Sequence, residues 1–266
     1  MNHEQQRHHH HMILVHGIGH GAWCWYRLVD RFHSSSPDRL VTAIDLGGCG
    51  ADPRSFDSIL TVADYVQPLM DLLESLPSHK RVILIGHSYG GLPIALAAER
   101  FPEKVAAAVF LTAYMPGCSS PLGHLLQEYF RRGNETQFLD CTFSLEQGQQ
   151  KLPTWAAFGP KYMANTLYAG CQSEDLEMAE KLIRPGQLFV DEMMRYVLTE
   201  EKYGRVKKVF ILCEEDEVMN VDFQRFLIQN SPPDHVKIME GAYHMAMLSK
   251  PKELQQCLDE IVAKYG

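Results

Sequence analysis

Short apolar runs recur along the first half of the chain, and stretches of helical period lie between them. This helical period is seen at residues 23–32, 62–76 and 92–100. Strand-like runs that alternate with helices are typical of a parallel sheet covered by helices on both faces. The pattern therefore predicts an α/β fold with a mostly parallel, doubly wound sheet, whose first strands contain the runs MILVHG, LVTAIDLGG, RVILIGHS and VAAAVFLTA.

The alternation stops after the fourth run. Residues 116–201 are rich in Phe, Tyr, Met and Leu, with helical pieces, Gly-Pro breaks and no convincing strand. Strand and helix then alternate again, in the runs VKKVFILC and HVKIME and the helical stretches 223–228 and 252–264. We therefore expect a disordered N-terminal tail at 1–11, a core formed by residues 12–115 and 202–266, and an inserted, mainly helical cap at 116–201.

Composition and net charge indicate which kinds of binding partner the protein has. The 266 residues are 45% hydrophobic with a formal net charge of −8, which argues against nucleic acid or an anionic membrane as a partner. The longest apolar stretch, Val105–Met115, is too short to span a bilayer. Seven cysteines without C-x-x-C spacing indicate reduced thiols and a cytoplasmic protein. We expect a small-molecule substrate, leave a homodimer open, and exclude the histidine run at 8–11 from the chemistry.

The stretch LIGHSYGG places Ser88 between two glycines directly after an apolar run. G-x-S-x-G at the end of a strand favours a serine nucleophile on a tight turn, although serine is also a common helix N-cap. Acyl transfer further requires a base and an acid that orients the base, both after the serine in chain order. Asp216, after VFILC, and His244, after HVKIME, follow Ser88 in that order.

Neighbouring side chains compete for these roles. The carboxylate most suitably placed is Asp216, because its short side chain can reach an imidazole from this turn, although a solvated acidic turn is the alternative for it and for Glu214, Glu215 and Glu217. His87 precedes the serine and is expected to point away from it. His235 falls before its strand, at the opposite end of the sheet. His244 is therefore the favoured base.

A glycine-rich loop, HGIGHGA at 16–22, follows the first strand. One of its backbone N–H groups and that of Tyr89 are candidates for holding an oxyanion. The loop also satisfies G-x-G-x-x-A, and Asp45 ends the next strand where a ribose-binding acid would lie, so nicotinamide binding is an alternative. Aromatic residues crowd the turn after this loop, and a cofactor site would not explain the ordered serine, acid and base. Acyl transfer is therefore favoured.

Five segments closely resemble the plant methylesterase and hydroxynitrile lyase family of α/β-hydrolases: HGIGHGAWCWY, GHSYGG, RFPEKVAAAVFLTAYMP, EKYGRVKKVFILCEED and GAYHMAMLSKP. The resemblance runs from about residue 12 to residue 265. It implies the α/β-hydrolase fold and a catalytic triad of Ser88, Asp216 and His244. It also implies an oxyanion hole formed by the N–H groups of Ile18 and Tyr89, with no metal and no organic cofactor.

The family contains both esterases and lyases. The lyases carry a threonine after the first-strand histidine and a lysine after the catalytic histidine, whereas this chain has Gly17 and Met245 at these positions. The resemblance thus implies a serine carboxylesterase that hydrolyses, through an acyl-enzyme, the methyl ester of a small to medium hydrophobic acid, such as a plant hormone or an alkaloid intermediate. Two alternatives stay open: hydrolysis followed by loss of CO₂ from a β-carbonyl acid, and a slow or non-catalytic hormone-binding protein.

Aromatic and methionine side chains in the cap predict an apolar tunnel over the carboxyl edge of the sheet, with the substrate-binding residues Gly17, Tyr114, Trp155, Phe158 and Met245. Ala156 and Ala157 are small for the family, which indicates either a wider tunnel for a bulkier acid or compensation by the adjacent tryptophan. A histidine base with the ordinary pKa of ~6.5 predicts activity that rises through about pH 6 to 7.

Overall fold

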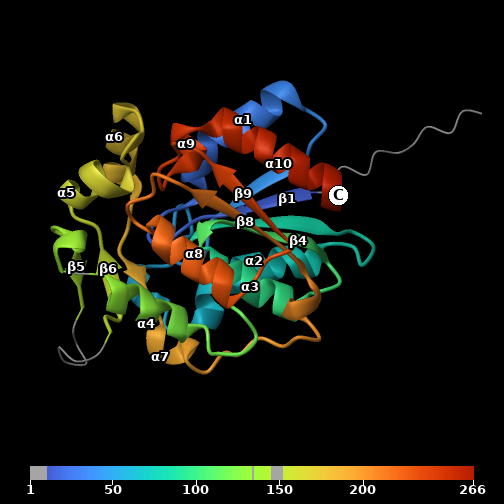
Figure 1. Ribbon diagram of the computed structural model, residues 1–266, viewed down its shortest axis with the longest axis horizontal. Coiled ribbons are helices and arrows are strands. Elements are labelled where there is room, and N and C mark those ends of the chain that lie inside the picture. The colour runs from blue at the N-terminus through green and yellow to red at the C-terminus, as the bar shows by residue number, and fades with distance from the viewer. Residues whose placement is uncertain (1–10, 134, 145–151) are drawn as a thin grey trace, which may run out of the picture.

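The computed structural model describes residues 11–133, 135–144 and 152–266. A fully parallel six-stranded sheet forms its centre (Figure 1), with the strands in the order β2-β1-β3-β4-β8-β9. The strands are β1 (His11–Val15), β2 (Val41–Ile44), β3 (Val82–Ser88), β4 (Val105–Ala113), β8 (Lys207–Cys213) and β9 (His235–Met239). The α/β fold and the six strands that the sequence predicts are confirmed.

The order of the strands determines where a crevice forms at the edge of the sheet. The chain runs from β1 outward to β2 and then returns to place β3 on the other side of β1. At such a reversal, the loops that follow the two inner strands separate and leave a crevice at the carboxyl edge of the sheet. β3 and β4 are buried along their whole length, as their apolar sequences without alternation require. The loops after β1 and β3 therefore start from inner strands of the sheet.

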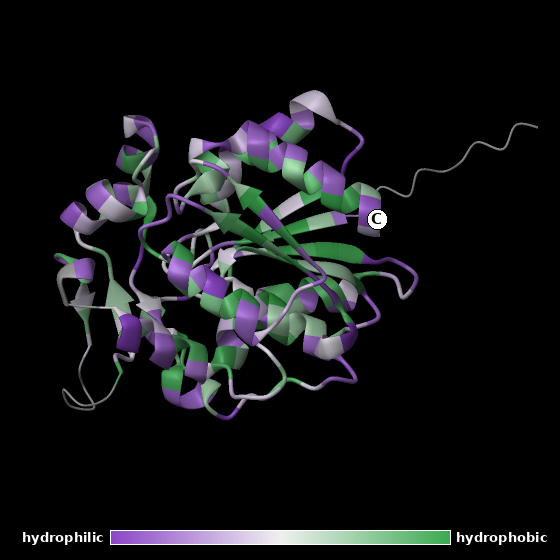
Figure 2. Ribbon diagram, in the orientation of Figure 1, coloured by the Kyte–Doolittle hydropathy of each residue, from purple (hydrophilic) through white to green (hydrophobic). Residues whose placement is uncertain are grey.

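Helices cover both faces of the sheet (Figure 1). Helices α1 (Tyr26–Ser35), α9 (Ala246–Ser249) and α10 (Pro251–Tyr265) lie on one face, and α2 (Val62–Ser75), α3 (Gly91–Arg100) and α8 (Val221–Asn230) on the other. Figure 2 shows the apolar strands enclosed between helices whose outer sides are polar. Short 3₁₀ turns occupy Ala22–Trp25, Phe56–Ser58, Glu135–Phe138 and Tyr203–Arg205.

Local sequence explains the shape of α2. Thr61 caps the helix: its hydroxyl accepts the N–H of Asp64 at 3.1 Å, while the Asp64 carboxylate accepts the N–H of Thr61 at 3.0 Å. Pro68 lies inside the helix and has no N–H to donate to the carbonyl of Asp64. A guanidinium N–H of Arg54 donates to that carbonyl instead, at 3.2 Å. The proline is therefore tolerated because a side chain replaces the missing hydrogen bond.

The segment between β4 and β8 forms a separate group of elements at the carboxyl edge of the sheet (Figure 1). It contains α4 (Gly123–Arg132), α5 (Pro160–Tyr162), α6 (Ser173–Leu182), α7 (Val190–Met193) and a π-helical turn at Met163–Leu167. It also contains a small antiparallel sheet of β5 (Thr142–Phe143), β6 (Trp155–Ala157) and β7 (Gly186–Gln187). The expectation of no strand here is wrong, because strands of two or three residues are too short for an alternating pattern to show.

The predicted boundary of the N-terminal tail needs one correction. The predicted disorder of residues 1–10 lies outside the described residues. His11, which the sequence assigns to the tail, belongs to β1 and its ring pairs with the Thr42 hydroxyl at 2.7 Å. Among the helices described, none is both long and apolar enough to cross a membrane.

Candidate active site

Ser88 ends β3 in a strained backbone conformation. Its φ of 54° lies in the left-handed region, which a residue with a side chain rarely adopts, and the pairing of β3 with β4 shifts register between His87 and Ser88. Helix α3 begins afterwards with Gly90 as its N-cap and without a capping side chain. Ser88 is therefore not the cap of α3, and the strained turn places it at the wall of a cavity instead.

The two glycines around Ser88 are required by close backbone contacts. A Cβ atom on Gly86 would lie 2.6 Å from the carbonyl oxygen of Gly90, and a Cβ atom on Gly90 would lie 2.5 Å from that of His16. Real Cβ atoms do not approach backbone oxygens so closely. The G-x-S-x-G spacing is therefore the sequence that this sharp strand-to-helix turn permits.

Asp216 and His244 meet on the loops that follow β8 and β9. The Nδ1–H of His244 donates to Oδ2 of Asp216 at 2.7 Å, and both residues are buried. The backbone N–H groups of Val218 and Met219 donate to Oδ1 of Asp216, each at 2.8 Å. These donors hold the carboxylate in one orientation and the imidazole with it. Because Nδ1 of His244 is engaged, Nε2 is the ring nitrogen left for the cavity that His244 lines.

The four carboxylates of the turn after β8 differ in their exposure to solvent. Asp216 is 3% exposed, whereas its neighbours Glu214, Glu215 and Glu217 are exposed. Sequence analysis did not identify Thr112, at the end of β4, whose hydroxyl also donates to Oδ2 of Asp216. Thr112 has a φ of 35°, so the backbone is strained at this position too. A single hydroxyl residue in the otherwise apolar run VAAAVFLTA was the available signal.

The loop after β1 approaches the serine closely. A Cβ atom on Gly17 would lie 3.1 Å from the Cβ atom of Ser88, so the backbone of this loop passes directly beside the serine. Ile18 and Tyr89 both line the cavity, and within the described part of the chain neither of their backbone N–H groups donates to a protein acceptor. The arrangement leaves two N–H donors next to Ser88 for a ligand.

Two buried histidines fix this loop. The Nδ1–H of His16 donates to the carbonyl of Gly17 at 2.7 Å, and Nε2 accepts the N–H of Leu46 at 3.1 Å. The Nδ1–H of His20 donates to the carbonyl of Ile18 at 2.8 Å. Burial lowers the pKa of both rings, and that of His20 falls to about 3. Both rings are therefore neutral near pH 7, with one donor and one acceptor nitrogen each.

Asp45 does not have the freedom that ribose binding would require. Its Oδ1 accepts the N–H of Ala22 at 2.6 Å, and its Oδ2 accepts the N–H of Ala51 at 3.1 Å. A Cβ atom on Gly50 would lie within 3 Å of this carboxylate, at 2.4 Å from its Cγ. Asp45 thus joins the loops after β1 and β2 to each other, and this explains its place at the end of β2 without a cofactor.

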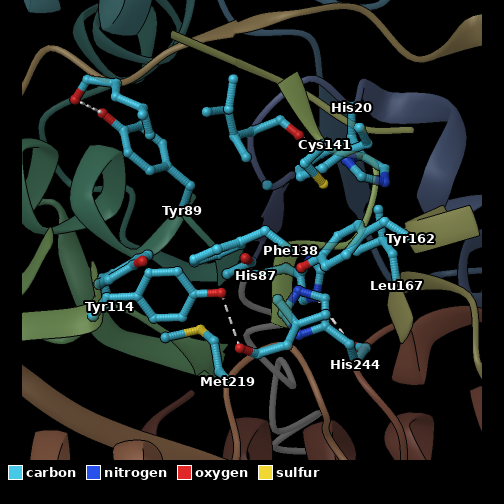
Figure 3. Close-up of a pocket in the computed structure, with 18 of the residues that line it drawn as sticks. His20, His87, Tyr89, Tyr114, Phe138, Cys141, Tyr162, Leu167, Met219 and His244 are labelled. Atoms are coloured by element: carbon cyan, nitrogen blue, oxygen red, sulfur yellow. Dashed lines mark hydrogen bonds between the residues drawn. The ribbon is translucent and has the colours of Figure 1, made fainter. Parts of the chain in front are cut away.

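The candidate active site is a cavity between the carboxyl edge of the sheet and the inserted segment (Figure 3). On the sheet side it brings together Ser88, His244 and the loop residues Gly17 and Ile18. On the side of the insertion its wall is mostly aromatic, with Tyr129, Phe138, Phe158 and Tyr162 among the lining residues. The three residues that the sequence proposes as a triad therefore lie around one site, with Asp216 behind the histidine.

The predicted substrate-binding residues divide into two groups. Gly17, Tyr114 and Phe158 line the cavity. Trp155 does not, because its ring packs against Phe56 with centroids 6.2 Å apart. Met245 also lies away from the cavity, fully buried before α9. Of the two adjacent alanines, Ala156 lines the cavity and Ala157 does not, since neighbouring residues of β6 point to opposite sides.

His87 lies closer to the site than the sequence suggests. The sequence-based expectation is a side chain that points away from the serine, yet the ring of His87 lines the cavity with its centroid 4.5 Å from that of His244. Its Nε2–H donates to the backbone carbonyl of His244 at 3.0 Å. The expectation is therefore wrong: the ring of His87 lies at the cavity, beside that of His244.

Comparisons with known proteins agree with this architecture. Residues 12–255 match the model of the alpha/beta hydrolase family. The chain is 46% identical to Methylesterase 10 of Arabidopsis thaliana over all of its own length and 96% of that protein, and 41% identical to Methyl jasmonate esterase 1 of Vitis vinifera over 96% of its length and 97% of that protein. It is also similar to the crystal structure of polyneuridine aldehyde esterase, with a TM-score of 0.89, 39% identity and coverage of 95% of this chain and 98% of that one. The chain belongs to the alpha/beta hydrolase family, within its branch of plant methylesterases.

Proposed function

We propose that this protein is a serine carboxylesterase that hydrolyses the methyl ester of a small to medium hydrophobic acid. The observation that carries the proposal is the strained Ser88 at the wall of the same cavity as His244, whose other ring nitrogen is bound to buried Asp216. The esterase names of the relatives support the same reaction class.

Each step of acyl transfer has a group in this site. The hydroxyl oxygen of Ser88 attacks the ester carbonyl while Nε2 of His244 takes the hydroxyl proton, and Asp216 stabilises the imidazolium that forms. The N–H groups of Ile18 and Tyr89 donate to the oxyanion. The imidazolium then returns the proton to the leaving methoxide. A water molecule then gives a proton to Nε2 of His244 and attacks the acyl carbon. The bond to the Ser88 oxygen breaks, that oxygen takes the proton back from His244, and the acid is released.

The two positions that distinguish esterases from lyases in the family pattern also support hydrolysis. Gly17 adds no side chain beside Ser88, so no second hydroxyl is available there to hold a cyanohydrin. Met245 is fully buried and apolar, so it supplies no cation for a departing anion. The polar groups next to the serine are those that ester hydrolysis needs.

The cavity is suited to an apolar acid. Its lining is predominantly apolar, with eight Phe and Tyr side chains among the lining residues, as is usual in sites for small organic ligands. We propose that residues 116–201 act as a cap whose aromatic side chains bind the acid part, since Phe138 and Tyr162 come from this segment. We place the reaction in the cytoplasm, in keeping with seven cysteines that are all free thiols.

Replacement of the proposed nucleophile tests the function. We expect Ser88→Ala to lower kcat/KM for methyl esters of aryl and cycloalkyl acids by roughly four to six orders of magnitude, with an unchanged circular dichroism spectrum. The rate is measured by gas-chromatographic quantification of the methanol released. Ser120→Ala, in the loop after β4, is the matched control and should retain the rate of the wild type. Near-wild-type hydrolysis by Ser88→Ala would overturn the proposal.

A further inference from the structure

One short segment of the insertion, residues 184–188, contacts both places that carry a proposed oxyanion donor. At one end, the backbone N–H of Arg184 donates to the carbonyl of Gly19, in the loop after β1, at 2.9 Å. At the other end, the carbonyl of Leu188 accepts the hydroxyl of Tyr89 at 2.8 Å (Figure 3). The segment therefore connects the loop after β1 to the residue that follows the proposed nucleophile.

The middle of this segment packs closely against Ile18. A Cβ atom on Gly186 would clash with Cγ1 of Ile18 and lie 3.1 Å from the backbone nitrogen of Gly19. A glycine is therefore needed for the two backbones to lie so close together. Gly186 itself does not line the cavity. The segment thus supports the loop after β1 from outside the aromatic wall that faces the acid.

The segment is itself held in place by the rest of the fold. Its strand β7 pairs with β6, and the N–H of Leu188 donates to the carbonyl of Thr154 at 2.8 Å. A guanidinium N–H of Arg184 donates to the carbonyl of Gly48, in the loop after β2, at 3.1 Å. Phe189, directly after the segment, has a φ of 47°, and such strain persists only where surrounding contacts impose it.

We propose that residues 184–188 position both oxyanion donors, the N–H groups of Ile18 and Tyr89. The inference rests on the proposed esterase function, in which these groups hold the oxyanion. Such donors stabilise a transition state because they already point to the place where negative charge develops. A displaced donor therefore slows the reaction more than it weakens the binding of the uncharged ester. Replacements in this segment should act like those on the sheet side of the cavity.

Gly186→Ala tests the contact with Ile18. The added methyl group should displace the loop and lower kcat by about 10- to 100-fold, equally for methyl benzoate and for the methyl ester of a polycyclic acid. KM should change by less than about 3-fold. Ile18→Ala removes the atom that the methyl group meets, so Gly186→Ala should have less than about a 3-fold effect in that background. Gln187→Ala is the matched control, because side chains alternate along β7, and it should retain the wild-type kcat.

Tyr89→Phe tests the second contact, since it removes the hydroxyl that the Leu188 carbonyl accepts. It should lower kcat by about 10-fold for both esters. Inhibition by trifluoroacetophenone then separates positioning from a general loss of structure. The Ser88 oxygen adds to the carbonyl carbon of this ketone, His244 takes the proton, and the carbonyl oxygen becomes an oxyanion. Its inhibition constant should rise in step with the fall in kcat, whereas that of acetophenone should change by less than about 3-fold.

The outcomes separate this inference from the proposed function. An unchanged kcat in either Gly186→Ala or Tyr89→Phe would overturn the inference alone. So would a loss confined to the larger ester, a loss that Ile18→Ala does not relieve, or a lower kcat without weaker inhibition by trifluoroacetophenone. Failure of the wild type to hydrolyse either ester would instead overturn the proposed function.

Discussion

The two sides of the cavity are built by different kinds of interaction. On the sheet side, backbone strain and hydrogen bonds fix Ser88, Asp216 and His244 at the ends of strands. On the side of the insertion, rings pack edge to face: the centroids of Phe138 and Phe143 lie 5.1 Å apart. Hydrogen bonds are directional, whereas apolar contacts tolerate changes of shape more readily.

This contrast assigns different tasks to the two sides. The sheet side holds its polar groups in one geometry, as a reaction with fixed stereochemistry requires. The insertion can change the size of the cavity by single substitutions in its aromatic wall. A replacement on the sheet side should therefore affect the rate for every ester, and one on the insertion side should change the order of preference among esters.

The largest expected effect is on the sheet side. Asp216→Asn keeps the shape of the side chain but no longer stabilises a protonated His244, so kcat should fall by about 10⁴-fold for large and small esters alike. Glu217→Gln, at the exposed neighbouring position, is the control and should retain activity. Steady-state kinetics with both esters is the measurement. A loss below about 10-fold, or a loss confined to one ester, would contradict the division of tasks.

Lowering the pH should destabilise the folded protein through buried histidines on the sheet side. Burial lowers the pKa of His16, His20 and His87 below the ordinary value of 6.5, for His20 to about 3. The unfolded chain takes up these protons near pH 6.5 and the folded chain does not, so the stability present above that pH is lost as the pH falls toward the folded pKa. Each of these rings that stays unprotonated in the folded chain contributes up to about 1.4 kcal/mol per pH unit.

Urea unfolding between about pH 6.5 and 5 measures this slope. His20→Asn should reduce the slope, because one of the rings whose pKa is lowered by burial is removed. The same replacement at exposed His33 is the control. A slope that is unchanged in His20→Asn would show that this ring does not resist protonation in the folded protein.

The smallest effect is expected on the insertion side. Ala156→Met adds a side chain to the cavity wall and should penalise a large ester relative to a small one by about 1–3 kcal/mol in kcat/KM. Ala157→Met is the matched control, because this neighbour does not line the cavity. Comparison of kcat/KM for a methyl ester of a polycyclic acid and for methyl benzoate gives the result. Equal effects of both substitutions would show that Ala156 does not limit the acid.

The sequence predicts the sheet side better than the insertion. Continuous apolar runs and the G-x-S-x-G turn are local signals, and each is forced by burial or by a close backbone contact, as at Gly86. The contact between Asp216 and His244 follows from the parallel sheet, because the carboxyl ends of its strands share one edge. These parts could be predicted because position along the chain determines position in space.

The remainder depends on contacts between distant segments. Trp155 was expected at the cavity and packs against Phe56 instead, because the short β6 directs alternate side chains to opposite sides. The hydrogen bond from the Tyr89 hydroxyl to the carbonyl of Leu188 also depends on where the insertion folds back over the sheet. No periodicity in the sequence records such pairings, since they join residues far apart in the chain.

The most direct test of the central claim is to trap the covalent intermediate on Ser88. Mixing the enzyme with a p-nitrophenyl ester in a stopped-flow instrument should give a burst of about one nitrophenolate per active site, as expected when an acyl-enzyme accumulates. Acid quenching followed by peptide mass spectrometry should then place the acyl group on Ser88. A protein that binds the ester without releasing nitrophenolate, or an acyl group found on another residue while Ser88 stays free, would contradict the account.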